Sequence, residues 1–299
     1  MLATVAALTT LFVSQQTDTQ VAVRPGTRLD MTNLGGTIVV RTWPQNAVRV
    51  HAEHSDRTVI QIALDAAALN IKASGGRGAP QDVNYTITAP RWMPLNLSGI
   101  RTDVEVEGSE ASVTVETVNG DVKCRGGSGY ISLHSVSGSI GLQQAKGRVQ
   151  VQTVSEGVTL TDVTGDITAE TVSGDVRLEG IESGNVDIST VSGEVVYDGT
   201  IHDAGHYRFS THNGDVIIAI PDKTNATIAV STFNGDFDSS FPVSVTETKR
   251  RRFDFTIGSG SAHVELSTFN GDIKLRRPGH LHDEHDHDEH DGGHEDEDN

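Results

Sequence analysis

The stretch Thr171-Val172-Ser173-Gly174-Asp175-Val176 decides the fold, because close versions of it recur along the chain. Each version has a hydroxyl residue, an apolar residue, Ser or Asn, and a glycine, followed by an apolar alternation. A motif that recurs at a fixed period indicates a stack of similar structural units. Versions of its first four residues occupy 117–120, 135–138, 171–174, 190–193, 232–235 and 268–271.

The turns between repeats set the size of the unit. Apolar residues lie two and four positions after most turn glycines, which is the alternation of a strand with one buried face. The hydroxyl-containing motif marks every second turn, so the full unit is a coil of about 18 residues with two short strands. In the most regular part, the glycines follow one another at intervals of nine residues: Gly120, Gly129, Gly138 and Gly147.

A single coil of this kind cannot bury its apolar face, whereas a stack of coils can. The sequence therefore predicts an all-β fold, a β-solenoid similar to a parallel β-helix, with hairpin insertions. The repeat register is lost over 56–92 and over 238–260. Strand-like runs within these two stretches predict the hairpins.

Four regions follow from the pattern. Residues 1–19 are interpreted as a signal or leader segment, because their first part is apolar, uncharged and too short to span a bilayer. Residues 20–92 are predicted to form an N-terminal β coil with hairpins, and 93–277 the solenoid repeats. Residues 278–299 are predicted to be a disordered tail rich in His, Asp and Glu. We expect an exported protein of the periplasm or cell surface, without a stable membrane span.

The formal net charge of −18 is unevenly distributed. Residues 280–299 hold ten Asp or Glu and no Lys or Arg, which leaves 31 acidic and 23 basic residues elsewhere. Nucleic-acid binding requires basic surface, so we expect no nucleic-acid partner. Cys124 is the only cysteine, which excludes an internal disulfide and a cysteine-based zinc cluster.

Stacking turns each repeat position into a column of similar residues, and one column is acidic. A row of carboxylates could bind calcium, which prefers hard oxygen ligands. We favour the alternative, in which each Asp accepts backbone N–H groups within its own turn. The acidic column consists of Asp121, Asp175, Glu194, Asp215, Asp236 and Asp272.

Two further columns come from the first two motif positions. We interpret the hydroxyl column as a cross-strand Thr ladder that stabilises the sheet, with a sugar-binding or ice-binding row as the alternative. The apolar column contains His212, which we interpret as a partly buried structural histidine. The hydroxyl column is Thr117, Ser135, Thr153, Thr171, Thr190, Thr211, Thr232 and Thr268, and the apolar column is Val118, Val136, Val154, Val172, Val191, His212, Phe233 and Phe269.

The sequence offers little evidence of catalysis. It contains no Gly-x-Ser-x-Gly elbow, no His-Glu-x-x-His pair and no phosphate-binding loop. Repeated residues share equal environments, whereas catalysis needs one perturbed environment, so we expect a protein that is not an enzyme. A carbohydrate-active solenoid enzyme is the alternative, and a cleft lined by Asp, Glu or Arg outside the repeat columns would favour it.

The tail is the most distinctive feature outside the repeats. Imidazoles spaced along a flexible chain can gather Zn, Ni or Cu. The body requires no cofactor, so the tail is the candidate metal site. Its histidines, interleaved with acidic residues, are His280, His282, His285, His287, His290 and His294.

Outside the tail, the chain resembles the bacterial putative-adhesin family, which consists of exported β-strand-repeat proteins of unknown function. The resemblance covers about residues 20–277. It implies a solenoid and export, and it supplies no catalytic residues. The stretches that carry it are Gly36–Val40, Val48–Val50, Tyr85–Pro90, Leu95–Leu97 and the motifs from Thr117 onward.

Three functional hypotheses follow. The leading one is a non-enzymatic, extracytoplasmic β-solenoid that acts as a structural or adhesin-like interaction module, with a surface glycan or protein as its partner. The first alternative is periplasmic binding of divalent metal through the histidine-rich tail. The second alternative is the carbohydrate-active solenoid enzyme.

Overall fold

The computed structural model describes residues 15–75, 82–242, 247–249 and 252–279. The described chain is built of strands and turns, and it divides into two compact units, Met1–Thr153 and Val154–Asn299. Within the described residues, no helix has the length and apolarity needed to cross a membrane.

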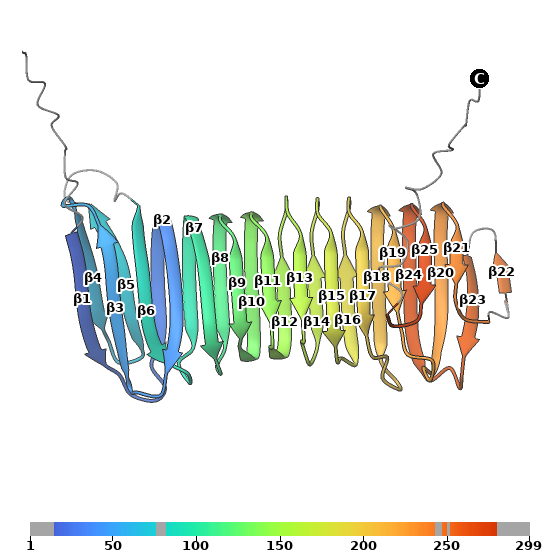
Figure 1. Cartoon of the computed structure of the whole chain (residues 1–299), viewed down its shortest axis with the longest axis horizontal. Helices are drawn as coiled ribbons and strands as arrows, with labels where there is room; N and C mark the ends of the chain where they lie inside the picture. The colour runs from blue at the N-terminus through green and yellow to red at the C-terminus, as the bar shows by residue number, and fades with distance from the viewer. Residues whose placement is uncertain (1–14, 76–81, 243–246, 250–251, 280–299) are drawn as a thin grey trace, which may run out of the picture. The chain divides into compact units, whose positions relative to one another are not determined.

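The first unit is a stack of mostly parallel strands (Figure 1). Its strands are β1 (Gln15–Ala22), β2 (Arg28–Trp43), β3 (Ala47–His54), β4 (Thr58–Leu64), β5 (Ala68–Gly75), β6 (Val83–Pro90), β7 (Leu95–Ser109), β8 (Val113–Asn119), β9 (Val122–Gly126), β10 (Ser128–Ser137), β11 (Ile140–Gln143) and β12 (Lys146–Gln152). One wall of the unit runs β4, β5, β2, β7, β8, β10, β12. The other wall runs β1, β3, β6, β2, β7, β9, β11.

Strand pairing in the first unit follows the sequence period. Val113 lies beside Ile131, and Ile131 lies beside Val149, so each coil repeats after 18 residues. All three side chains are buried, as are the alternate apolar residues of the neighbouring strands. The predicted all-β solenoid is therefore confirmed, including the size of its coil.

Antiparallel strands end the stack of the first unit. β5 and β6 run parallel to β2, whereas β4 is antiparallel to β5 and β3 is antiparallel to β6. β1 pairs antiparallel with β3 and starts at Gln15. Residues 15–19, which the sequence pattern places in the leader, are thus part of a paired strand.

The second unit repeats this architecture. Its strands are β13 (Val158–Thr161), β14 (Ile167–Glu170), β15 (Val176–Ile181), β16 (Asn185–Ser189), β17 (Val195–Gly199), β18 (His206–Asn213), β19 (Val216–Ala219), β20 (Ala226–Asn234), β21 (Phe237–Ser239), β22 (Glu247–Lys249), β23 (Arg252–Ile257), β24 (Ala262–Asn270) and β25 (Ile273–Arg276). One wall runs β13, β15, β17, β19, β25, β21. The other wall runs β14, β16, β18, β24, β20, β23, β22.

The coils of the second unit do not stack in chain order. The last coil, β24 and β25, lies between β18–β19 and β20–β21, and it pairs parallel with both (Figure 1). Beyond β20, the antiparallel strands β23 and β22 end the wall. A strictly sequential stack would instead place β20 beside β18.

The interior is filled mainly by Val, Ile and Leu, and the second unit also contains aromatic clusters, one of which lies around Tyr197. There the ring of Tyr197 packs against those of Phe209 and Tyr207, at centroid distances of 4.9 and 6.4 Å. The Tyr197 hydroxyl donates to the Thr200 carbonyl, and the Tyr207 hydroxyl donates to the Ser183 carbonyl. In the first unit, Cys124 is a buried packing residue, and burial raises the pKa of its thiol to about 12.

Candidate functional site

At each motif turn, a glycine lies directly against the backbone of the adjacent coil. Gly214 has φ +145°, and a Cβ added there would lie 2.1 Å from the carbonyl oxygen of Gly193. A Cβ added to Gly193 would lie 2.0 Å from the carbonyl oxygen of Gly174. Only glycine fits such a close approach, so the recurrence of glycine has a steric reason.

The motif threonines are buried beside this glycine stack. Thr190 Oγ1 donates to the Gly174 carbonyl at 3.2 Å, and Thr211 Oγ1 donates to the Gly193 carbonyl at 3.0 Å. The interpretation as a Thr–Thr ladder is therefore wrong, because each hydroxyl bonds a glycine carbonyl of the neighbouring coil instead. The alternative, that these hydroxyls form a row that binds sugar or ice, is also excluded, since Thr190 and Thr211 are only 6% and 7% exposed.

The acidic column is also part of the coil-to-coil hydrogen bonding. Asp175 Oδ1 accepts the backbone N–H of Glu194, and Asp215 Oδ1 accepts that of Asp272, both at 2.8 Å. The prediction that each Asp bonds within its own turn is wrong: the bond reaches the same position in the next coil. Among the described residues, no group of three or more His, Cys, Asp or Glu is placed to hold a metal ion.

Glu194 is the exception in this column. Its carboxylate is partly buried, and it stands between those of Asp175 and Asp215. Burial first, and the negative charges of Asp175 and Asp215 second, raise the pKa of Glu194 above its usual value of 4.5. The acidic column thus links neighbouring coils by hydrogen bonds, and Glu194 is a position in it where the negative charge is electrostatically unfavourable.

The second motif position forms an exposed apolar row in the second unit, here called the corner row. Hydrogen bonds from Ser173, Ser192 and Asn213 to the carbonyls of the preceding coil fix its register. Val191, Phe269 and Phe233 are 46%, 41% and 49% exposed. In spatial order, the corner row consists of Val154, Val172, Val191, His212, Phe269 and Phe233.

The aromatic members of the corner row stack on one another. The His212 and Phe269 rings are 4.8 Å apart at 12°, and the Phe269 and Phe233 rings are 4.7 Å apart at 3°. These distances equal the spacing of neighbouring strands. The interpretation of His212 as partly buried is wrong, because its side chain is exposed and continues the aromatic stack.

An amide row accompanies the aromatic stack. Asn270 Nδ2 donates to Asn213 Oδ1, and Asn234 Nδ2 donates to Asn270 Oδ1, both at 2.8 Å. Each amide therefore fixes its neighbour beside an exposed ring. The first unit has apolar residues at the equivalent position, where Ile100 and Val118 are exposed and Val136 is half-buried.

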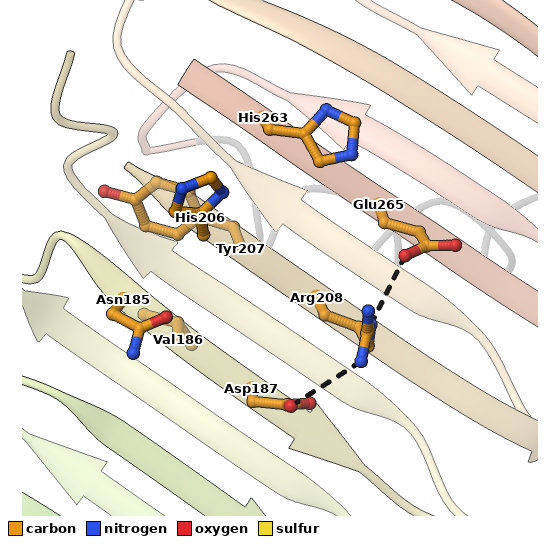
Figure 2. Close-up of a pocket in the computed structure, with 8 residues that line it drawn as sticks. All are labelled: Asn185, Val186, Asp187, His206, Tyr207, Arg208, His263 and Glu265. Atoms are coloured by element: carbon orange, nitrogen blue, oxygen red, sulfur yellow. Dashed lines mark hydrogen bonds and ion pairs between the residues drawn. The ribbon is translucent and has the colours of Figure 1, made fainter. Parts of the chain in front are cut away.

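A small pocket lies on the outer face of β16, β18 and β24 (Figure 2). Asn185, His206 and His263 form one row across the three strands, because parallel pairing places them side by side. The pocket has a volume of about 160 Å³. Pockets that bind small molecules usually enclose roughly 300–1,000 Å³, so this one is small.

The second row of the pocket is an ion-pair network. Arg208 lies between Asp187 and Glu265, with its Nη1 3.8 Å from Asp187 Oδ2 and its Nε 3.3 Å from Glu265 Oε2 (Figure 2). Both carboxylates therefore share one guanidinium. Both acids are thus engaged in ion pairs with Arg208, whereas glycoside hydrolysis needs one carboxylic acid and one carboxylate free to act on the substrate.

The repeat pattern alone does not predict this pocket. Its signal was available, because His206 and His263 occupy the same position in the repeat, one residue before a buried residue. What brings them together is the displaced last coil, which the period does not reveal. The predicted metal ligands His280, His282, His285, His287, His290 and His294 lie outside the described residues.

Comparison with known proteins supports the family expected from the repeats. Residues 169–276 match the model of the Toastrack DUF4097 family. A solved structure, described as that of a putative cell adhesion protein from Clostridium sporogenes, is 9% identical, with a TM-score of 0.25. That alignment covers 88% of this chain and 99% of the other. Comparison with curated proteins gives no match. The family match over residues 169–276 agrees with the prediction, made from the motifs, of a β-strand-repeat family of unknown function.

Proposed function

We propose that the chain is a non-enzymatic, extracytoplasmic interaction module that binds a surface protein through the corner row. The observation that carries this proposal is the register of that row, which sets exposed apolar side chains in line at strand spacing. Contiguous exposed apolar surface marks interaction sites in soluble proteins. The buried Thr and Gly columns hold the row rigidly, so little conformational entropy is lost on binding.

The stacking of the rings favours a protein partner over a glycan. A sugar ring binds an aromatic side chain by lying on the face of the ring. In the corner row, both faces of Phe269 are covered, by His212 on one side and Phe233 on the other. The ring edges that remain exposed suit apolar side chains of another protein, and the amide row beside them offers hydrogen bonds.

The pocket supports a role outside catalysis. It contains Asp, Glu and Arg outside the acidic column, as the enzyme alternative requires, but Asp187 and Glu265 are both bound to Arg208. Its volume of about 160 Å³ is also small for a disaccharide.

A binding experiment tests the proposal. Fluorescently labelled chain is added to envelopes of the organism that makes it, before and after protease treatment. We expect protease to abolish binding, and the double variant Phe269→Ser with Phe233→Ser to weaken it about 30-fold, which is typical of the loss of an aromatic hot spot. Tyr130→Ser is the matched control, because Tyr130 is a similarly exposed aromatic residue outside the row. Equal binding by both variants would contradict the proposal.

A second role is proposed for the tail, which is binding of Zn, Ni or Cu. The sequence carries this proposal, with six histidines among ten acidic residues in 280–299. Neutral imidazole is a common ligand of these metals. The two roles are separable, since removal of the tail leaves the corner row in place.

A further inference from the structure

Strand β4 presents an unprotected edge at the end of the first unit. In the described part of the chain, β5 is the only strand that pairs with β4. Its sequence, Thr58-Val-Ile-Gln-Ile-Ala-Leu64, has no charge and no proline. Val59 and Leu64 are 58% and 48% exposed. Natural edge strands usually carry a charged residue or a proline, which discourages pairing with another chain.

The other terminal strand of this unit is different. β1 contains Asp18, which Arg49 of β3 holds by two hydrogen bonds of 2.9 and 2.5 Å. A charged side chain discourages the addition of another strand at such an edge. Of these two terminal strands, β4 is therefore the one whose edge carries no charged residue.

The hydrogen-bond pattern identifies the backbone groups that face outward. Asp65 N–H donates to the Ala68 carbonyl at 2.9 Å, so this pair is a hydrogen-bonded one. Bonded and non-bonded pairs alternate along an antiparallel ladder. Val59, Gln61 and Ala63 therefore direct their backbone groups toward β5, and the backbone groups of 60, 62 and 64 point away from it.

We propose that β4 pairs antiparallel with β4 of a second copy of this chain, which joins the first units of two molecules. With Gln61 opposite Gln61 of the second copy, Ile60 lies opposite Ile62. These are residues whose backbone groups face outward in both copies, so the hydrogen-bonding positions match. Every side chain of the strand then meets an uncharged one.

Charge complementarity selects this register. The same pairing brings Arg57, just before the strand, opposite Asp65 of the second copy, and the two-fold axis repeats this contact at the other end. Asp65 Oδ1 accepts the N–H groups of Ala67 and Ala68, which fixes the carboxylate and lowers its pKa. A shift by two residues would lose both opposite-charge pairs.

The occupant is a second copy rather than an unrelated strand, because the match is self-complementary. Outside 280–299 the chain still has 31 acidic and 23 basic residues, so two copies carry charge of the same sign. An uncharged strand flanked by one Arg and one Asp is a place where two copies can meet. The inference does not depend on the corner row, which lies on a different part of the fold.

The experiment measures association of the full chain by analytical ultracentrifugation. We expect a concentration-dependent dimer. Gln61→Glu should weaken it at least tenfold, because two carboxylates then lie directly opposite each other. Arg57→Glu should also weaken it, whereas Arg57→Lys should not. Gln143→Glu is the matched control, since Gln143 is exposed on β11, away from this edge.

A crosslinking variant tests the register without added charge. Cys124 is buried, so Gln61→Cys introduces the one accessible thiol among the described residues. In the proposed register Gln61 and its counterpart form a non-hydrogen-bonded pair, in which the Cα atoms lie about 4.5 Å apart, within the roughly 4.4–6.8 Å that a disulfide spans. Mild oxidation should crosslink Gln61→Cys and leave Gln143→Cys monomeric. A wild-type chain that stays monomeric at its highest soluble concentration would overturn the proposal, as would a dimer that Gln61→Glu leaves unchanged.

Discussion

Replacement of Gly214 by alanine tests whether the glycine stack holds the coils together. The new Cβ would lie 2.1 Å from the Gly193 carbonyl oxygen, whereas an ordinary contact begins at 3.4 Å. The two coils must therefore separate locally by about 1 Å, because the obstacle is backbone rather than a movable side chain.

The expected loss of stability has two parts. Alanine at φ +145° is strained, which costs about 1–3 kcal/mol. Separation of the coils lengthens two hydrogen bonds of 3.0 Å, from Thr211 Oγ1 to the Gly193 carbonyl and from Gly193 N–H to the Asn213 carbonyl. At about 0.5–1.5 kcal/mol each, the total is about 2–6 kcal/mol. That is a large share of the roughly 5–15 kcal/mol that stabilises a typical domain.

Urea unfolding followed by circular dichroism measures this effect. Gly184→Ala is the matched control in the same unit, because a Cβ there meets nothing within 4 Å. We expect the control to change the free energy of unfolding by less than about 1 kcal/mol. If the two variants unfold at the same urea concentration, the argument from the glycine stack is refuted.

Three further predictions concern other features of the second unit and the tail. Thr211→Val should lower the free energy of unfolding by about 1–3 kcal/mol, because the Gly193 carbonyl loses its donor, and an unchanged urea midpoint would contradict this. Glu194→Gln should raise the urea midpoint at pH 7. The raised pKa means that the folded state binds the proton more tightly, so stability is highest below pH 4.5 and falls as the pH rises through the folded pKa. The advantage of Glu194→Gln should therefore vanish below about pH 4.5, and an advantage independent of pH would refute the electrostatic account. A chain that ends at Gly279 should lose calorimetric binding of Zn, Ni and Cu and keep its urea midpoint, and retained binding would exclude the tail as the site.

The coil could be predicted from the sequence because the apolar residues that recur along the chain are the same residues that the fold buries. Val113, Ile131 and Val149 recur every 18 residues, and each of them is buried at the same place in the wall. Periodicity does not, however, specify which coil lies beside which. The motifs at 232–235 and 268–271 are identical, so either would fit beside β18.

The hydrogen-bond partners of the motif were harder to predict for a related reason. A repeated Thr or Asp can bond within its own turn or with the next coil, and the sequence is the same in both cases. The structure selects the second for Thr211 and Asp175, because the close approach of the glycines brings adjacent turns together. The exposure of His212 followed from the same geometry, since the position after the buried threonine points outward.

The displaced last coil has a consequence for the way the chain acquires its structure. In a repeat protein each repeat ordinarily contacts only the repeats next to it in the chain. Here β20 leaves the ribosome before β24, yet β24 must occupy the place between β18 and β20. Until then, the partner of β20 among the described strands is β23, which runs antiparallel to it and follows it closely in sequence.

The second unit therefore cannot complete its strand pairing until the final coil, β24 and β25, is available. Its pairings join distant parts of the sequence, and such contacts form slowly. A chain interrupted before Ala262 would lack β24 and β25, the strands that pair with both β18–β19 and β20–β21 in the complete fold. Because of this order of the coils, both walls of the second unit are completed only when the last coil, β24 and β25, has been added.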